Sequence, residues 1–247
     1  MHKIIIIILI FIVILIIYKK IDFYKKFPFK VYNYSKLTKK EFYSITSLQE
    51  PALFKNALNH NIHINDFCDK LSNKQMRTRY GNYTGLGGQI TRKFKNITLG
   101  DLCKNINNSS QYGGNNIITL KEQLLSNIKL NNKNFDISRN GKLWIGPTNS
   151  STPLHKDKPE NLSLQVYGKK KWKFFNKNDN VNLCFNDNNN KLEWSNYSMA
   201  DINTCPSAIN AKLYEIVMTP GDMLYLPSQW AHEVNNETNS IMINFWY

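Results

Sequence analysis

The distribution of apolar positions divides the chain into three parts. Residues 4–17 form an unbroken apolar run, residues 31–140 mix helix and strand signals, and residues from 142 onward alternate short apolar runs with turn residues. This last part contains seven runs of strand length that are rich in β-branched and aromatic side chains: KLWIG, NLSLQV, KKKWKFF, KLYEIVM, MLYLP, WAHEV and SIMINFWY. Many short strands without amphipathic helices between them predict a mostly β fold, a sandwich or barrel of the jelly-roll kind.

The middle part predicts helices that flank this β fold. Thr38 precedes KKEFYSI and Asn65 precedes DFCDKL, and each side chain can cap the first turn of a helix. The segments MRTRYGNY and GGQITRKF, joined by glycines, predict a β-hairpin, because no G-K-S/T follows as a phosphate-binding loop requires. TLGDLCKNI and TLKEQLLSNI predict short helices, and the Asn-rich interval 176–196 predicts a long loop.

The apolar run at residues 4–17 predicts a membrane anchor. It reaches only about 22 Å as a helix, short of a hydrocarbon core of about 30 Å, and a signal peptide is the alternative. No small-x-small cleavage site follows, so we expect a transmembrane or signal-anchor segment at 1–20, a basic linker at 21–30 and a globular domain at 31–247. Lysines are more frequent after the run than before it, which predicts that the domain faces the cytoplasm.

Charge and cysteine content narrow the choice of partners. The formal net charge of +14 comes mostly from lysines scattered through a chain rich in Asn and Ile. No basic helix or RNA-binding signature accompanies this charge, so we expect no nucleic-acid partner. The four cysteines form no C-x-x-C pair, which predicts free thiols in a reducing compartment instead of a zinc site or a disulfide framework.

Three residues, His155, Asp157 and His232, are candidate metal ligands. His155 and Asp157 lie two positions apart, so on an extended strand both side chains leave the same face. His232 follows a PGD turn and the strand-like MLYLP. Two imidazoles and one carboxylate on one side of a metal form the facial triad of non-haem Fe(II) oxygenases. The alternative is that His155 is a polar residue beside a turn and His232 a half-buried strand histidine.

Three blocks of sequence around these residues resemble the JmjC and cupin-like (cupin 8) family of Fe(II)- and 2-oxoglutarate-dependent oxygenases. The blocks are TPLHKDKPENLSLQVYGKKKWKFF, YEIVMTPGDMLYLPSQWAHEV and INFWY, and they are most similar to the branch that contains the asparaginyl hydroxylase of the hypoxia response. The resemblance implies a double-stranded β-helix (the jelly-roll or cupin barrel) with flanking helices. It also implies Fe(II) at His155, Asp157 and His232, with 2-oxoglutarate as the cosubstrate.

The resemblance further implies a pocket for 2-oxoglutarate. Lys170 stands where a family lysine pairs with the distal carboxylate of the cosubstrate, because a carboxylate removed from water must be charge-paired. Strand alternation predicts that Lys170 points away from the lysines on either side of it. The other positions that match pocket residues of the family are Thr152, Asn161 and Asn244, with Trp246 as an aromatic beside them. The family's upstream tyrosine has no counterpart near IITLKEQLL, where Thr119 stands.

The implied activity is the hydroxylation of a protein or peptide, coupled to conversion of 2-oxoglutarate into succinate and CO₂. The alternatives are a lysyl demethylase, a small-molecule or lipid oxygenase, and a catalytically silent cupin-like domain that binds a metal or ligand. The chain ends at Tyr247, where the hypoxia-response enzyme continues into dimer-forming helices. We therefore expect no dimer through C-terminal helices.

Overall fold

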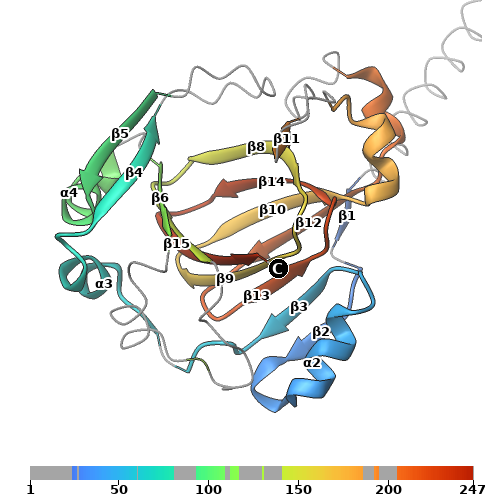
Figure 1. Cartoon of the computed structure of the whole chain (residues 1–247), viewed down its shortest axis with the longest axis horizontal. Helices are drawn as coiled ribbons and strands as arrows, with labels where there is room; N and C mark the ends of the chain where they lie inside the picture. Colours follow the sequence, from blue (N-terminus) through green and yellow to red (C-terminus); the bar gives the residue numbers. More distant parts are fainter. Residues whose placement is uncertain are drawn as a thin grey trace, which may run out of the picture.

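A computed structural model describes residues 24–26, 28–59, 61–80, 93–108, 112–116, 130, 141–185, 192–194 and 205–246. Two β-sheets face one another at the centre of the molecule, as Figure 1 shows: β8, β14, β10 and β12 form one wall, and β13, β9 and β15 form the other. The predicted jelly-roll barrel is confirmed by this arrangement.

The six-stranded sheet carries the candidate metal ligands. Its order is β1 (Tyr24–Lys26), β12 (Leu213–Met218), β10 (Lys170–Phe175), β14 (Ala231–Asn236), β8 (Ser151–Asp157) and β11 (Leu192–Trp194). All of its pairings are antiparallel except that of β1 with β12. Strands that lie far apart in sequence are therefore neighbours, which brings the third candidate ligand on β14 beside the first two on β8.

The nine-stranded sheet forms the opposite wall and extends beyond the barrel at both ends. Its order is β2 (Val31–Asn33), β3 (Ala52–Lys55), β13 (Met223–Leu226), β9 (Asn161–Tyr167), β15 (Ser240–Trp246), β7 (Gly141–Gly146), β6 (Tyr112–Asn116), β4 (Gln75–Tyr80) and β5 (Lys93–Thr98). β4 and β5 pair antiparallel, as expected of the predicted hairpin, but β5 overlaps the predicted segment 87–94 only at its end, and residues 81–92 lie outside the described residues.

Both faces of the central strands in this sheet are buried. On β9, Leu162 and Leu164 join a large apolar core that also contains Phe42 of α2 and Phe67 of α3. Asn161 and Ser163 lie on the other face of β9, toward the barrel interior, where Asn161 accepts hydrogen bonds from other interior side chains. The barrel therefore has an apolar outer support and a partly polar lumen.

Short helices flank the barrel: α2 (Lys39–Thr46), α3 (Ile64–Lys70) and α4 (Leu99–Lys104), with 3-10 turns η1 (Tyr34–Lys36), η2 (Ile106–Asn108), η4 (Lys177–Asn182) and η6 (Pro206–Asn210). Thr38 caps α2 as predicted, because its side chain accepts a hydrogen bond from the backbone N–H of Glu41. The predicted cap at Asn65 is wrong, since α3 begins at Ile64 and its N-cap is His63, two residues before Asn65. The helix predicted at 119–128 lies outside the described residues.

The Asn-rich interval 176–196 is not a simple loop. It contains η4, and its strand β11 pairs with the ligand strand β8, so that Leu192 lies opposite Asp157 and Trp194 opposite His155. The backbone groups of β11 find their hydrogen-bond partners on β8, whatever the side chains are. The asparagine-rich composition of the interval therefore gave no sign of this strand.

The expected membrane anchor at residues 1–20 lies outside the described residues. Among the residues that the structure does describe, no helix combines the length and apolar character needed to span a bilayer. The predicted membrane localisation, with the domain facing the cytoplasm, is contradicted by this finding and is not retained. Within the expected basic linker at 21–30, Tyr24–Lys26 form β1 and pair in parallel with β12.

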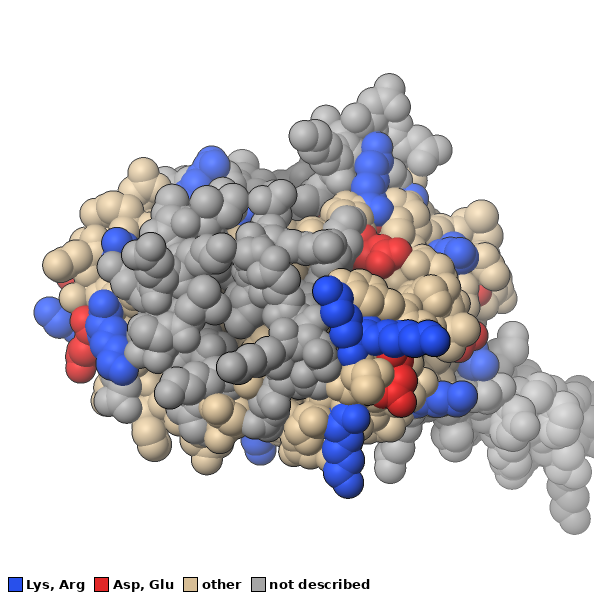
Figure 2. Space-filling view, turned by 60° about the horizontal axis from the view of Figure 1, so that its bottom comes forward, with Lys and Arg blue, Asp and Glu red and all other residues tan. Residues whose placement is uncertain are grey.

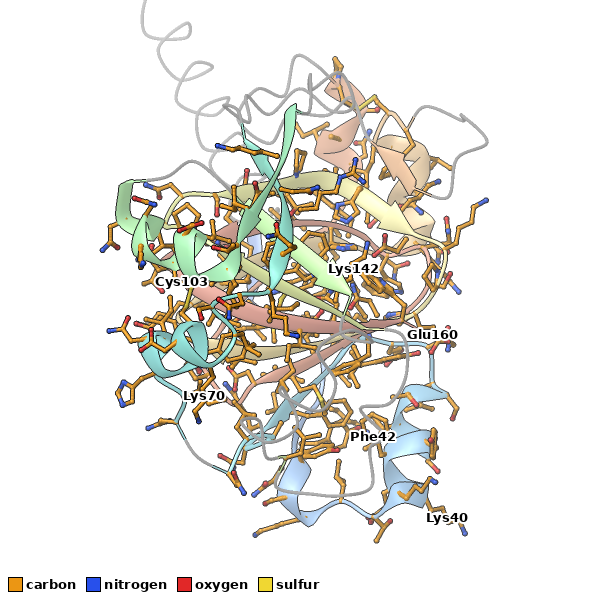
Figure 3. All side chains as sticks on the ribbon, turned by 60° about the vertical axis from the view of Figure 1, so that its left-hand side comes forward. Lys40, Phe42, Lys70, Cys103, Lys142 and Glu160 are labelled. Carbon is orange, nitrogen blue, oxygen red and sulfur yellow. A yellow bond between two sulfur atoms is a disulfide. The ribbon has the colours of Figure 1, made fainter. Side chains whose placement is uncertain are left out.

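The prediction of free thiols is also wrong. Cys68 is bonded to Cys103, with 6.2 Å between their Cα atoms, and Cys184 is bonded to Cys205 at a Cα separation of 6.0 Å. The first disulfide joins α3 to α4, where Figure 3 labels Cys103, and the second joins the segments that follow η4 and precede η6. Such bonds persist in oxidising compartments, so the expected reducing compartment is not supported either.

Surface charge is dispersed where it can be seen. On the face drawn in Figure 2, Asp and Glu side chains lie among the described Lys and Arg side chains, a few of which touch one another near the centre. The scattered lysines of the sequence thus do not merge into one continuous basic patch on that face.

Candidate metal centre

The fold brings His155, Asp157 and His232 to one point inside the barrel. His155 and Asp157 extend from β8, and His232 lies directly opposite His155 on the neighbouring strand β14. One ligand atom from each residue lies within 4.8 Å of the others, and the three residues are only 7, 9 and 2% exposed, respectively. In the part of the chain that the structure describes, no second group of His, Cys, Asp and Glu side chains converges in this way.

Both imidazoles are oriented by the backbone. Nδ1 of His155 lies 2.7 Å from the carbonyl oxygen of Pro153, and Nδ1 of His232 lies 3.0 Å from that of Trp230. A carbonyl oxygen only accepts hydrogen bonds, so each Nδ1 carries the proton and donates it. The unprotonated Nε2 atoms can then serve as metal ligands, and such outer hydrogen bonds are the usual support of metal-binding histidines.

Two other segments hold Asp157, one through its carboxylate and one through its backbone. Trp246 of β15 donates a hydrogen bond from Nε1 to Oδ2 of Asp157 at 3.4 Å, and this oxygen lies 3.8 Å from Nε2 of His232. The backbone N–H of Gln229 donates to the carbonyl oxygen of Asp157 at 3.0 Å. Gln229 has a φ of +67°, in the left-handed region. The turn before β14 adopts this conformation where its backbone contacts the end of β8.

An aromatic ring and a set of amides surround the triad. The Trp172 ring stacks on that of His232, with 5.5 Å between centroids and 21° between planes. Asn161 Oδ1 accepts hydrogen bonds from Asn244 Nδ2 at 3.0 Å and from Ser163 Oγ at 2.8 Å. The polar lumen wall is therefore an ordered network, and the two asparagines predicted to line the pocket belong to it.

Several buried polar atoms of this lumen have no partner among the described residues. They are Asn244 Oδ1, Gln165 Oε1 and Trp172 Nε1. Buried polar groups in folded proteins are nearly always hydrogen-bonded to protein, water or ligand. A polar molecule such as 2-oxoglutarate fits a lumen that offers both unsatisfied donors and unsatisfied acceptors.

Lys170 lies in β10 toward the other end of the barrel. It is 0% exposed and pairs with Asn236 of β14, four positions from His232 along that strand. Its neighbour Lys171 points outward instead and forms an ion pair with Glu215 at 3.3 Å. The predicted alternation of the lysines is thus confirmed, and the Lys170 side chain is buried inside the barrel at a distance from the triad. Thr152, on β8, is half-buried and lies opposite Val234.

Sequence reasoning missed several residues around the centre. Gln229 and Trp172 carry no motif of their own, and their roles depend on contacts between strands that are distant in sequence. Lys142 and Trp144 are a different case, because alternation within KLWIG places both on one face of β7 and could have indicated the barrel interior. Thr119, which stands near the position of the missing family tyrosine, lies outside the described residues.

Comparison with known proteins assigns the chain to a recognised family. The family model for the cupin-like domain matches residues 28–247. The chain is 33% identical over 144 residues to JmjC domain-containing protein C of Dictyostelium discoideum, covering 53% of this chain and 34% of that protein. It is 32% identical over 108 residues to Jumonji C domain-containing protein 5 of Drosophila melanogaster, with coverages of 43% and 27%.

A third relative has a name that states an activity. The chain is 30% identical over 109 residues to lysine-specific demethylase 8 of Danio rerio, which corresponds to 42% of this chain and 26% of that protein. The chain therefore spans only about a third or less of the length of these relatives. The resemblance inferred from the three sequence blocks is confirmed at the level of the family.

Proposed function

We propose that this chain, which belongs to the cupin-like family of JmjC-type Fe(II)- and 2-oxoglutarate-dependent oxygenases, is a protein or peptide hydroxylase. The observation that carries this proposal is that the imidazoles of His155 and His232 and the buried carboxylate of Asp157 converge on a single point. Each imidazole is held by a hydrogen bond from its Nδ1 to a backbone carbonyl oxygen. This set of ligands on one side of a metal leaves positions open for a cosubstrate and O₂, as in other non-haem Fe(II) oxygenases.

Each part of the barrel has a role in this proposal. His155, Asp157 and His232 hold Fe(II) through two nitrogens and one carboxylate oxygen. Lys170 neutralises the distal carboxylate of 2-oxoglutarate, while Asn161 and Asn244 fix its polar groups and Thr152 assists Lys170. The bound metal and cosubstrate supply the oxidising chemistry, in which O₂ and 2-oxoglutarate yield succinate, CO₂ and a hydroxylated carbon. The buried walls limit the access of water and position the substrate carbon.

A lysyl demethylase is the second candidate, because relatives of this chain are named lysine-specific demethylases. Both activities consume 2-oxoglutarate in the same way and differ in the carbon that is oxidised. When that carbon belongs to an N-methyl group, the product breaks down to formaldehyde, whereas other hydroxylated carbons keep the added oxygen. The resemblance to the asparaginyl hydroxylase branch favours hydroxylation.

Succinate release tests the oxygenase itself. Purified protein incubated with Fe(II), 2-oxoglutarate and O₂ is expected to release succinate, and His155→Ala should lower the rate by at least about 100-fold because a metal ligand is lost. His63→Ala is the control, since His63 is exposed at the start of α3. Equal rates for His155→Ala and the unchanged protein would show that this site does not hold the metal.

The product then separates the two candidate activities. With a protein substrate, a hydroxylase gives a stable mass increase of one oxygen atom by mass spectrometry. A demethylase instead gives formaldehyde and the loss of one CH₂ for each turnover. Formaldehyde in stoichiometric amount with succinate would refute the hydroxylase proposal while leaving the oxygenase proposal intact.

A further inference from the structure

We propose that Lys142, Trp144 and Trp246 form an anion-binding subsite beside the metal centre, which receives a carboxylate of the substrate. This inference rests on the proposed function, and it names the chemical class of the group that the oxygenase recognises. The target is thus an acidic peptide or another molecule with a carboxylate near the oxidised carbon, and not a methylated lysine.

The backbone places this group inside the barrel. Lys142 of β7 lies directly opposite Asn244 of β15, and Trp144 lies opposite Met242. Asn244 donates to Asn161 within the lumen, and Met242 belongs to the same buried apolar cluster as Trp172. Residues directly opposite one another on paired strands share a face, so Lys142 and Trp144 also face the lumen. Figure 3 labels Lys142 among side chains of the barrel.

The ammonium group of Lys142 is held between two indole rings. Its Nζ lies 5.7 Å from the centroid of the Trp144 ring and 5.3 Å from that of Trp246. All three residues are half-buried, which strengthens these cation–π contacts relative to a fully exposed site. The charge is therefore fixed in position.

This charge stands close to the metal centre. The indole of Trp246 that contacts Lys142 also donates to Asp157 Oδ2, at 3.4 Å. Only one aromatic ring thus separates the ammonium from a candidate metal ligand. A group bound to Lys142 would hold the neighbouring carbon of the same molecule near the triad.

No carboxylate of the described residues pairs with Lys142. Other lysines differ in this respect, since Lys55 pairs with Asp222 at 2.8 Å and Lys171 pairs with Glu215 at 3.3 Å. A half-buried cation beside a catalytic centre, supported by aromatic faces alone, attracts an anion from outside the chain.

Two carboxylates could serve as that anion, one from the substrate and one from 2-oxoglutarate. Lys170 already provides a buried cation within β10, and it pairs with Asn236 near the far end of β14. Lys142 lies near the opposite end of the barrel, where β7 begins and β15 ends. The cosubstrate's distal carboxylate goes to Lys170, which leaves Lys142 for the substrate.

The same geometry disfavours a methylated lysine. Tryptophan faces are what proteins use to bind methylated ammonium groups, but these two faces are occupied by the chain's own ammonium. A second cation brought between them would be repelled by Lys142 at short range, where little water screens the charges.

Binding without turnover provides the first test. We titrate two pools of peptides of equal length into the Ni(II)-loaded protein. The pools differ at one position, which is Asp or Glu in the acidic pool and trimethyl-lysine in the other. Because Trp144 and Trp246 flank the subsite, the acidic pool should change tryptophan fluorescence at lower concentration than the methyl-lysine pool.

Lys142→Met keeps the length of the side chain, and it should weaken binding of the acidic pool by at least about tenfold. Lys142→Glu should reverse the preference.

The control variant is Lys39→Met. Lys39 also lies over an aromatic ring, that of Tyr43 at 5.9 Å, but this pair belongs to α2 outside the barrel. It should bind both pools as the unchanged protein does, and the melting temperatures of all variants report whether they are folded.

Turnover then separates the two possible sources of the carboxylate. With Fe(II) present, Lys142→Met should raise the KM for acidic peptide far more than the KM for 2-oxoglutarate. An equal rise in both, or a rise for 2-oxoglutarate alone, would assign Lys142 to the cosubstrate and overturn the proposal, as would equal binding of the two pools. Charge-dependent binding by Ni(II)-loaded protein that never releases succinate would instead keep the subsite and refute the oxygenase.

Discussion

Lys170 differs from the other lysines of its strand because its side chain is withdrawn from solvent. Lys171 and Lys173 on the same strand have outward ion-pair partners, at 3.3 and 4.0 Å respectively, whereas Lys170 is 0% exposed. An ammonium group is kept at such a position only where the interior offers it favourable interactions. The interior of this barrel also holds the asparagine network and the triad, which supports the proposed role of Lys170 in binding 2-oxoglutarate.

Replacing Lys170 by Met should weaken 2-oxoglutarate binding. Loss of one partner of a buried charge pair typically costs about 2 kcal/mol or more, which corresponds to a rise of about 30-fold or more in the dissociation constant. Isothermal titration of the metal-loaded protein with 2-oxoglutarate measures this change. Lys171→Met is the matched control and should leave the affinity unchanged, so a similar loss in both variants would contradict the role of Lys170.

Individual residues were predictable from the sequence where a local pattern constrained them. The alternation around Lys170 and the two-residue spacing of His155 and Asp157 both follow from strand geometry alone. Gln229 was not predictable, because its left-handed φ and its hydrogen bond to Asp157 depend on how the turn before β14 meets the end of β8. The pairing of Lys142 with Trp246 likewise requires knowledge of the strand register.

Among the elements, α2 begins with reciprocal hydrogen bonds between Thr38 and Glu41. The backbone N–H and the hydroxyl of Thr38 each donate to Glu41 Oε2 at 2.7 Å, and the N–H of Glu41 donates to Thr38 Oγ1 at 3.2 Å. The hydrogen bond from the Thr38 N–H, followed by that from its hydroxyl, lowers the pKa of Glu41 below its ordinary value of 4.5. These bonds fix the start of the helix.

Acid should weaken this cap. Because the pKa of Glu41 is lower in the folded protein than in the unfolded chain, its stabilising effect is present above pH 4.5 and is lost as the pH falls through the folded value. The melting temperature of Glu41→Gln should therefore be lower than that of the unchanged protein at neutral pH, and the two should converge in acid. Thermal unfolding followed by circular dichroism measures this difference, with Glu50→Gln as the exposed control. A difference that does not depend on pH would contradict the argument.

The elements were predicted best where side-chain periodicity was strong. The seven predicted strand segments after residue 140 all contain strands of the barrel. The start of α3 was misplaced because His63 takes the cap without a side-chain hydrogen bond, so no polar signal marks it. β11 was missed because its position is set by backbone pairing with β8 inside an Asn-rich stretch.

At the scale of the whole molecule, two disulfides cross-link peripheral segments to one another. Cys184–Cys205 closes the segment that contains β11, which pairs with the ligand strand β8. Cys68–Cys103 joins two helices that lie beside the nine-stranded sheet, and it closes a separation of 35 residues. The cysteines are distant in sequence and form no motif, so their pairing became evident only from the packing of these elements.

Removing a disulfide should lower stability measurably. For closed segments of this length the chain-entropy model gives a loss of about 3–4 kcal/mol in the free energy of unfolding. Urea unfolding of the double variant Cys68→Ser/Cys103→Ser, compared with the unchanged protein, measures this loss. Detection of four reactive thiols in the native, non-reduced protein would show that the bonds do not form.

The disulfides also restrict how the protein can be given its iron. Disulfide formation requires conditions that oxidise thiols, whereas the metal centre requires iron in the reduced, ferrous state. These demands are compatible if the cross-links form first and the ferrous ion enters the finished barrel later. Thiol reagents that keep iron ferrous also attack disulfides by exchange. Loading the purified, cross-linked protein with iron therefore calls for a reductant such as ascorbate, which reduces iron without entering thiol exchange.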